Sequence, residues 1–562
     1  MKPNPGKEGR QMEDQTETHL RNRKYTAELL SFFAYACALA VVMYFHEPWF
    51  DEAQAWLIAR DATIGELIGS ITHYEGHPPV WFLLLMPFAK AGVPFEIGVK
   101  SINFIFAASA MGLLIFKAPF SRAIRCVIPF TYFFFYQYGV ISRPYSLMML
   151  GFVLCALAYK NRNAKPYRFA GALAVVCGTS AYGIIIAAGI ALVWLIEIIR
   201  ERSIGKSIPA LLANRRIHAL GILFAINLFF VYCMIPYSDT YAANLEPHNT
   251  LLVRLFYMLF MAPADAVCSS SYGYSAIDIS FNMQAAGSLI MGSVINLAIF
   301  TAARIYGKTS LFVVPYAAFA ALSAFAYFYS HHLGIIVLFY VFLFWCMLGD
   351  RPVNPALPAF ILRSVKGERD MRYLRVVGLY LIIIILIVQV YWTIAATYKD
   401  ILKNYGTGRA AAEFITDNAF DELTIMTDWE KKTNYLTGLI RIDYNQLYCI
   451  PTLAYFDTNI FYNLNEGKCN KNYLTHIIDE NGYHVKKLAD GGYPDVLFGT
   501  VELKDIYGSK ANLHRDYALV CSVHGNTIWK DEVFENRQLI FLRRDLLEKY
   551  PDLVELDYIQ EM

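Results

Sequence analysis

Residues 21–56 decide the fold class: they read RNRKYTAELLSFFAYACALAVVMYFHEPWFDEAQAW. A basic cluster that ends at Lys24 precedes an apolar run, Tyr25–Phe45, of roughly 20 residues, the length of a membrane helix. This run exceeds the roughly 7–15 apolar residues of a signal-peptide core and no cleavage site follows it, so it predicts a retained membrane helix. Because Lys and Arg crowd the cytoplasmic flanks of such helices, residues 1–24 are predicted to form a cytoplasmic tail.

The composition extends this prediction to the whole chain. Of 562 residues, 56% are apolar and only 17% are charged, which is more apolar side chain than a soluble globule can bury. Aromatic residues contribute 15%, and Trp and Tyr favour membrane interfaces. The composition therefore excludes disordered, collagen-like and disulfide-stapled chains and indicates an integral membrane protein in contact with lipids.

Further apolar runs predict additional membrane helices, with basic connectors between them on the cytoplasmic side. These runs are 99–116, 123–140, 144–159, 167–181, 183–199, 217–235, 283–302, 311–329, 333–348 and 373–397. The apolar segment 78–91 is shorter than the roughly 17–25 residues that span a bilayer, so it is predicted to be short or re-entrant. We expect an odd total of roughly 11–13 transmembrane helices in a module at 25–397, with outer loops at 46–77 and 236–280.

The sequence becomes mixed and polar after Thr397, and residues 398–562 are predicted to form a soluble α/β domain. Gly406–Asn418 has the apolar spacing of an amphipathic helix. Short apolar runs predict strands at 423–426, 447–450, 496–499, 518–522 and 539–542.

The charges divide between these two parts. Residues 400–562 hold 17 Lys and Arg against 26 Asp and Glu, a net charge of −9, so the overall +2 leaves +11 for residues 1–399. The basic membrane part fits cytoplasmic loops, and the acidic domain suits an extracytoplasmic surface. No stripe of basic residues is typical of nucleic-acid binding, so no nucleic-acid partner is expected.

Two acids, Asp51 and Glu52, directly follow the first membrane helix between Trp49 and Trp56. A carboxylate beside aromatic rings in a water-facing cleft can have its pKa raised toward the range of a general base. Asp51 is also placed to cap the helix that follows, and the two roles are compatible.

A second polar cluster, His73, Glu75 and His77, precedes Pro78 and Pro79. Two imidazoles and a carboxylate within five residues have the chemistry to bind a divalent metal ion or an anion, although the prolines exclude a helical His-x-x-x-His face. A solvated interfacial loop explains the same residues.

Two further clusters adjoin predicted membrane helices on the same outer side. Arg143 and Tyr145 lie in Ser-Arg-Pro-Tyr-Ser, where an Arg either binds an anion such as phosphate or extends to the membrane surface as an anchor. His331 and His332 begin another apolar run, and two adjacent histidines at such a boundary favour a functional role over a buried core histidine.

These motifs together resemble the GT-C polytopic glycosyltransferases, in particular glycosyltransferase family 39, the protein O-mannosyltransferases, and the lipid A aminoarabinose transferases. The resemblance rests on Phe50-Asp51-Glu52-Ala53, on His77-Pro78-Pro79-Val80-Trp81 and on Tyr138–Ser146. It extends over nearly the whole chain, including an extracytoplasmic C-terminal α/β domain. Where the aminoarabinose transferases have Glu-Lys-Pro, this chain has Gly76-His77-Pro78, which removes a permanent cation.

The resemblance implies an inverting glycosyltransferase that moves a sugar from a polyprenyl-phosphate donor to a hydroxyl acceptor on protein, lipid or glycan. Asp51 would then be the catalytic base, and Glu52 would orient Asp51 or the acceptor. The donor phosphate would be bound by Arg143, Tyr145, His77, His331 and His332, because its growing charge needs cations or polarised donors.

Two other functions remain open from the sequence: a transporter or flippase of lipid-linked sugars, and a noncatalytic homologue in surface-polymer assembly. The sequence has no internal symmetry of the kind that transporters use. It also has no Asn-x-Ser/Thr sequon, which favours a bacterial plasma membrane, with the N-terminus cytoplasmic and the C-terminal domain outside.

Overall fold

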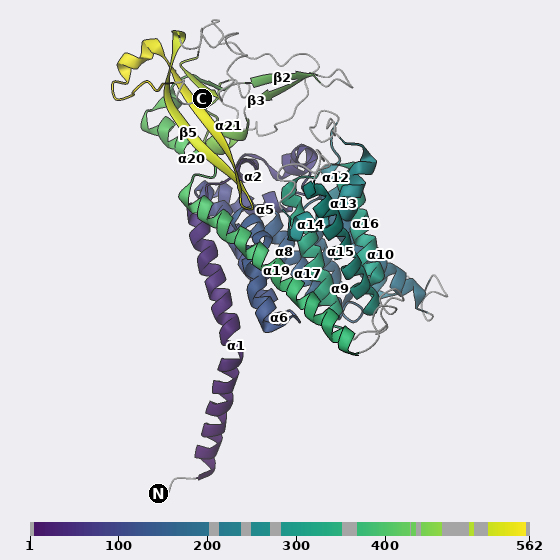
Figure 1. The fold of residues 1–562 in the computed structure, drawn as a ribbon. Coiled ribbons are helices and arrows are strands. Elements are labelled where there is room, and N and C mark those ends of the chain that lie inside the picture. Colours follow the sequence, from purple (N-terminus) through teal and green to yellow (C-terminus); the bar gives the residue numbers. More distant parts are fainter. Residues whose placement is uncertain are drawn as a thin grey trace.

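The structure, a computed structural model, describes residues 5–201, 209, 213–237, 249–269, 283–326, 328–350, 368–427, 429–433, 440–444, 446–462, 494–499 and 515–557. A helical bundle makes up most of them, and a small sheet lies beyond one end of this bundle (Figure 1).

Seven helices among the described residues are long and apolar enough to cross a membrane. They are α1 (Pro5–Phe45, apolar from Tyr25), α6 (Phe95–Lys117), α10 (Ala181–Arg200), α12 (Arg215–Met234), α15 (Met283–Ile305), α17 (Leu333–Leu348) together with the 3₁₀ turn before it from Ser330, and α19 (Glu368–Leu402). Only 22% of the apolar window of α12, α15 and α19 is buried within the protein, as expected for helices that face lipid. The chain is therefore a multi-pass membrane protein, as its composition predicts.

Five other apolar helices are shorter. They are α5 (Val80–Lys90), α8 (Tyr145–Tyr159), α9 (Pro166–Cys177), α13 (Leu251–Phe260) and α16 (Thr309–Phe325). Helix α5 corresponds to the predicted short segment 78–91, and at 1.5 Å per residue it covers only about half of the roughly 30 Å hydrocarbon core. Seven helices in the described residues have the full length, so the total of roughly 11–13 transmembrane helices stays a prediction.

The predicted membrane helix at 123–140 is wrong. The segment is divided into α7 (Arg122–Val127), the 3₁₀ helix η2 (Ile128–Phe130) and the π-helix η3 (Phe133–Val140). Pro129 interrupts regular helix pairing, and all eight residues of η3 are buried. The η3 part of the segment is apolar because it packs inside the protein.

The two predicted outer loops contain helices. Segment 46–77 folds into α2 (Phe50–Asp61), α3 (Ile64–Glu66), the π-helix η1 (Leu67–Ile71) and α4 (Thr72–Glu75). The described part of 236–280 contains α13 and α14 (Ala262–Val267), which pack on α15 and α16. Most of residues 251–267 are therefore helical.

The C-terminal part contains a four-stranded mixed sheet in the order β1-β4-β6-β5. Its strands are β1 (Ile425–Thr427), β4 (Val496–Gly499), β5 (Tyr517–Trp529) and β6 (Glu532–Arg543), with a separate hairpin of β2 (Trp429–Thr433) and β3 (Ile440–Tyr444). Helix α20 (Gly408–Asp417) agrees with the predicted amphipathic helix, and β1, β4, β5 and β6 agree with four of the predicted strands. The predicted strand at 447–450 is wrong, because these residues belong to helix α21 (Gln446–Leu453). The 3₁₀ turns η6 (Phe420–Glu422) and η7 (Arg544–Lys549) complete the described elements of this part.

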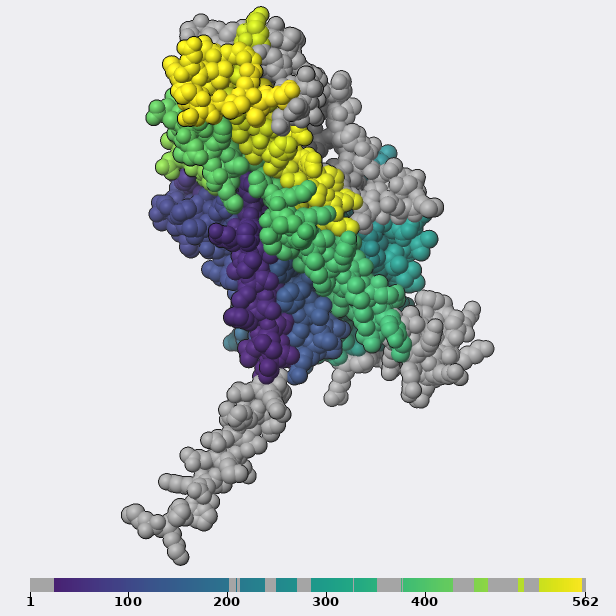
Figure 2. All heavy atoms as spheres, turned by 60° about the vertical axis from the view of Figure 1, so that its left-hand side comes forward, coloured from purple at the N-terminus to yellow at the C-terminus, as the bar shows by residue number. Residues whose placement is uncertain are grey.

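The sheet domain and the membrane bundle share their cores. Residues of α2 and α5 belong to the same buried apolar cluster as residues of α20, α21, β4 and β6. The long β5–β6 hairpin also reaches the bundle: Ile528 and Trp529 are part of its core, and the yellow hairpin lies along the green helix α19 in Figure 2. Helix α2 is thus held between the bundle and the sheet domain.

Candidate functional site

Helix α2 presents two neighbouring acids at its first turn, where carboxylates are favoured by the helix dipole. The helix begins at Phe50 and Trp49 occupies the N-cap position. The Glu52 carboxylate accepts the backbone N–H of Trp49 at 2.7 Å, so Glu52 caps the helix. The prediction that Asp51 is the capping residue is wrong, because the helix begins one residue before Asp51.

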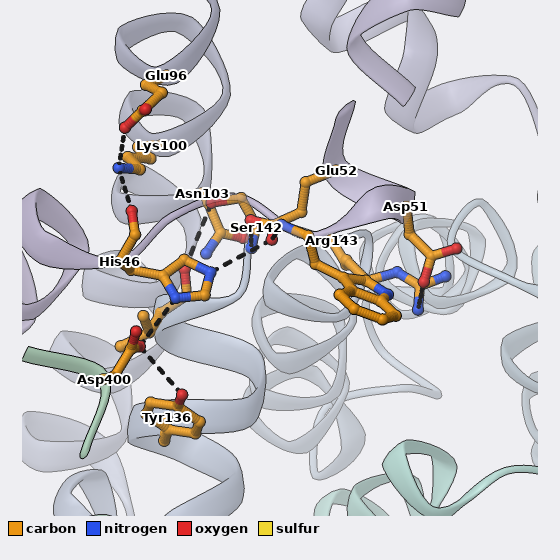
Figure 3. Close-up of polar contacts among 12 residues, drawn as sticks. His46, Asp51, Glu52, Glu96, Lys100, Asn103, Tyr136, Ser142, Arg143 and Asp400 are labelled. Atoms are coloured by element: carbon orange, nitrogen blue, oxygen red, sulfur yellow. Dashed lines mark hydrogen bonds and ion pairs between the residues drawn. The ribbon is translucent and has the colours of Figure 1, made fainter. Parts of the chain in front are cut away.

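Glu52 is fully buried and contacts groups from two separate parts of the chain. Its Oε1 accepts the backbone N–H of Ser142 at 2.6 Å, and its Oε2 lies 3.3 Å from Nε2 of His46. The other ring nitrogen of His46 lies 2.8 Å from Oδ2 of Asp400, which also accepts the hydroxyl of Tyr136 at 3.0 Å. Figure 3 shows Glu52 directed into this network and Asp51 directed away from it.

The charge of His46 follows from its two acidic neighbours. Burial lowers the pKa of His46, but the carboxylates of Asp400 and Glu52 outweigh it and raise this pKa to about 9. A protonated His46 therefore links α2 to the end of α19. In the sequence, Asp400 stands out only as an acid next to the last apolar run. Its partner His46 is far from it in the chain, so the sequence did not reveal the pair.

Asp51 forms an ion pair with Arg143, with 2.7 Å between Oδ2 and Nη1. Both side chains reach solvent, since 28% of the Asp51 side chain and 14% of the Arg143 side chain are exposed. Arg143 follows Ser142, whose backbone is bonded to Glu52. A single buried carboxylate thus fixes both the helix that carries Asp51 and the loop that carries Arg143.

Tyr145 is the centre of an aromatic cluster beside this ion pair. The guanidinium of Arg143 lies 5.5 Å from the Tyr145 ring centroid. Around the same ring are His77 at 6.4 Å, His331 at 5.9 Å and His332 at 6.1 Å between centroids. His331 and His332 stand at the 3₁₀ turn η5 (Ser330–His332) that leads into α17.

His77 is neutral in this environment. Burial and then the Arg143 charge lower the pKa of His77 to about 4. Its Nδ1 lies 3.0 Å from the carbonyl oxygen of Thr179, so the neutral ring donates from Nδ1 and presents Nε2 as an acceptor. This arrangement gives phosphate no cation at His77, and Arg143 is the cation next to Asp51.

Glu75 belongs to the cluster of His73, Glu75 and His77 that the sequence predicts for metal or anion binding, and it was not among the residues predicted for the glycosyltransferase site. It ends α4, and its Oε1 accepts Nε2–H of Gln54 at 3.0 Å. Burial and then the Asp51 carboxylate raise the pKa of Glu75 to about 8, against the opposing effect of Arg143. The one sequence feature that links Glu75 to the site is that it lies two residues before His77.

Six of the seven predicted site residues gather around the Asp51–Arg143 pair: Asp51, Arg143, Tyr145, His77, His331 and His332. Glu52 faces the opposite, buried network. In the described part of the chain, no group of three or more His, Cys, Asp or Glu side chains could hold a metal ion.

A pocket with a volume of about 170 Å³ lies where the start of α2 meets the sheet domain. Trp49, Phe50, Thr407, Phe534 and Asn536 are among its lining residues. Phe50 directly precedes Asp51, so the pocket opens beside the first turn of α2.

Comparison with protein-family models, curated proteins and solved structures gives no match for this chain.

Proposed function

We propose that this membrane protein is an inverting glycosyltransferase that moves a sugar from a polyprenyl-phosphate donor to a hydroxyl acceptor at the membrane surface. The observation that carries the proposal is the Asp51–Arg143 ion pair, a partly exposed carboxylate and guanidinium at 2.7 Å beside a ring of aromatic side chains. A reaction between a lipid-linked phosphate donor and a hydroxyl needs these two groups, a base and a cation.

Asp51 is the base in this proposal. Its carboxylate takes the proton of the acceptor hydroxyl as the hydroxyl oxygen attacks the anomeric carbon of the donor. General base catalysis of this kind contributes roughly 10²–10⁴-fold to a rate. The partial exposure of Asp51 supports this role, since an acceptor can reach the carboxylate from water.

Arg143 stabilises the phosphate that leaves. A guanidinium has five N–H donors in a planar fork and can bind a phosphate oxygen while it keeps a contact with a carboxylate. Charge grows on the phosphate as the bond to the sugar breaks, so a fixed cation there lowers the barrier. Tyr145, His331 and His332 line the Arg143 side of the site.

The membrane setting supports a lipid-linked donor. A polyprenyl chain is accommodated along apolar helices within the bilayer, while its phosphate reaches the water-facing end of the bundle. The pocket at Trp49 and Phe50, between the start of α2 and the sheet domain, offers space for part of the acceptor. The acceptor is therefore proposed to approach from the sheet domain, and the donor from the bundle.

The test is transfer of labelled sugar from polyprenyl-phosphate donors by purified protein in liposomes. Wild type is compared with D51N and with D61N, which removes the acid at the other end of α2 that pairs with Arg60. We expect D61N to keep the wild-type rate and D51N to lose it. Equal rates for D51N and wild type would contradict the proposal, and vectorial movement of intact donor without product would favour a transporter.

A further inference from the structure

We propose that Glu75 is the proton donor of this site: it protonates the phosphate oxygen that leaves the sugar, while Asp51 accepts the proton of the attacking hydroxyl. This inference rests on the glycosyltransferase function proposed above. It assigns the two carboxyl groups opposite roles in one reaction.

The first support is the position of the Glu75 carboxyl. Gln54 donates to Oε1 of Glu75 at 3.0 Å, and Gln54 follows Asp51 by three residues on α2. Side chains three residues apart lie on the same face of a helix. The contact with Gln54 therefore holds the Glu75 carboxyl on the Asp51 face. Gly76, with a φ of 61° that favours glycine, turns the chain directly after Glu75.

The second support is the balance of charges around Glu75. Within the described parts of the chain, the guanidinium of Arg143 is the cation that acts on Glu75, and it also forms an ion pair with Asp51 at 2.7 Å. The hydrogen bond that Glu75 receives comes from the neutral amide of Gln54. When two carboxyl groups share a site with a single cation, one of them tends to keep its proton.

The charged and titratable groups that face Glu75 agree with this assignment. Asp51 on α2 disfavours a second negative charge, and Arg143 before α8 favours it. His77, two residues further along, is neutral, since its pKa is lowered to about 4. Burial and Asp51 prevail over Arg143, and they raise the pKa of Glu75 to about 8. Glu75 therefore carries its proton at neutral pH. An acid and base pair needs one carboxyl group that holds its proton beside a second carboxyl group that is charged.

The proposed step is balanced in atoms and electrons. The acceptor oxygen forms a bond to the anomeric carbon and its proton passes to the Asp51 carboxylate. The bond from the anomeric carbon to the phosphate oxygen breaks, and its electron pair remains on that oxygen. The Glu75 proton then moves to the same oxygen. The products are the glycosylated acceptor and a polyprenyl phosphate, and both carboxyl groups recover their starting states by proton exchange with water.

The protonation of Glu75 is tested first, without any substrate. Infrared difference spectra of the purified protein are recorded as the pH is raised through 8, for wild type and for E75Q. We expect the carbonyl stretch of a protonated carboxylic acid to disappear near pH 8 in wild type and to be missing from E75Q. A wild-type spectrum without this band at pH 7 would overturn the assignment of Glu75, whatever the turnover of the enzyme.

The catalytic role is tested by transfer rates between pH 5 and 9 for wild type, E75Q and the control E66Q. Glu66 lies on the same segment and bonds Thr63. E75Q retains a side chain of the same shape, and its melting temperature in detergent shows whether it folds. We expect wild type and E66Q to slow as the pH passes 8. A folded E75Q should be roughly 10²-fold slower or more and should lack that decline.

The possible results separate this inference from the function on which it rests. A folded E75Q with the wild-type rate, or a slow E75Q with the same basic decline as wild type, would overturn the role of Glu75. No transfer by wild type from any polyprenyl-phosphate sugar would overturn the proposed function itself, and the infrared band would still report the charge of Glu75.

Discussion

The Asp51 carboxylate lies 2.7 Å from the guanidinium of Arg143, and both side chains reach solvent. Its neighbour Glu52 is fully buried and bonds the backbone of Trp49 and of Ser142. Adjacent acids on one helix therefore have different tasks. Glu52 sets the relative position of the two segments that carry Asp51 and Arg143, and Asp51 remains accessible for chemistry.

Replacing Glu52 should affect stability more than replacing Asp51. In E52Q the amide cannot accept from all the donors that converge on Glu52, and the protonated His46 loses one of its two carboxylates. Removing one partner of a buried charged pair costs about 3–5 kcal/mol. A partly exposed pair such as Asp51–Arg143 contributes only about 0–1 kcal/mol.

The measurement is the melting temperature of the purified variants in detergent. We expect E52Q to melt clearly below wild type, and D51N to melt close to it. A stable E52Q beside an unstable D51N would reverse the roles assigned to the two acids.

The network of His46 predicts a pH dependence of stability. Its pKa is raised from 6.5 to about 9 in the folded protein, so the protonated ring stabilises the fold. This contribution is complete below pH 6.5 and is lost as the pH rises through 9. At 1.36 kcal/mol per pH unit it amounts to about 3 kcal/mol.

The check is a series of melting temperatures between pH 6 and 10 for wild type and H46Q. Wild type should lose stability across pH 6.5–9, and H46Q should start lower and change less over the same range. Parallel curves for the two proteins would show that His46 is not the titrating group.

Binding of the donor phosphate should depend on the planar N–H donors of Arg143 as well as on its charge. R143K keeps a cation but loses the paired N–H donors that suit a phosphate. A hydrogen bond to a charged group contributes about 1.5–3 kcal/mol, so transfer from the donor should weaken roughly 10- to 100-fold. The matched control is R162K, which changes an Arg beyond the other end of α8 that pairs with Glu197.

The donor concentration that gives half-maximal transfer separates the possibilities for this residue. We expect it to rise in R143K and to stay at the wild-type value in R162K. An R143K enzyme with the wild-type donor dependence would remove Arg143 from the phosphate site.

Lys530, at the tip of the β5–β6 hairpin, should stabilise the contact between the sheet domain and the bundle. This buried side chain donates to the carbonyl oxygens of Asp265 and Ser269, and its Nζ lies 4.0 Å from the Trp392 ring centroid. In K530M both carbonyl groups lose this donor, at about 1–3 kcal/mol for each buried group left unsatisfied. The control is K403M. Lys403 is exposed, and its Nζ lies 4.0 Å from Oε1 of Glu535, so it forms a loose surface ion pair.

Limited proteolysis and thermal melting test this contribution of Lys530. K530M should melt lower than wild type and be cleaved faster in the hairpin, and K403M should behave as wild type. An unchanged K530M would mean that the apolar contacts of Ile528 and Trp529 hold the domain without the lysine.

The sequence predicts the features of this fold that depend on local patterns. Hydropathy identifies a multi-pass membrane protein, and amphipathic spacing identifies α20. The segment 123–140 shows where the pattern fails, because a run buried among other helices is as apolar as one that faces lipid. The segment 447–450 fails for a related reason: four apolar residues fit a strand and a buried helix equally well.

The candidate site was also only partly predictable from the sequence. Residue chemistry at a predicted membrane surface was enough to select Asp51, Arg143 and Tyr145, which lie together. The tasks of the neighbouring acids were not predictable, since they depend on where α2 begins and on the partner that each carboxylate meets. Asp400 contacts His46 and Glu75 contacts Gln54 only because the folded chain brings these distant residues together.

The most direct test of the account is the transfer rate of D51N, measured in liposomes with a polyprenyl-phosphate sugar donor under conditions where wild type turns over. With D51N folded and melting like wild type, the account predicts a rate lower by roughly 10²–10⁴-fold, and D61N at the wild-type rate. A folded D51N that transfers sugar as fast as wild type would contradict the assignment of Asp51 as the base.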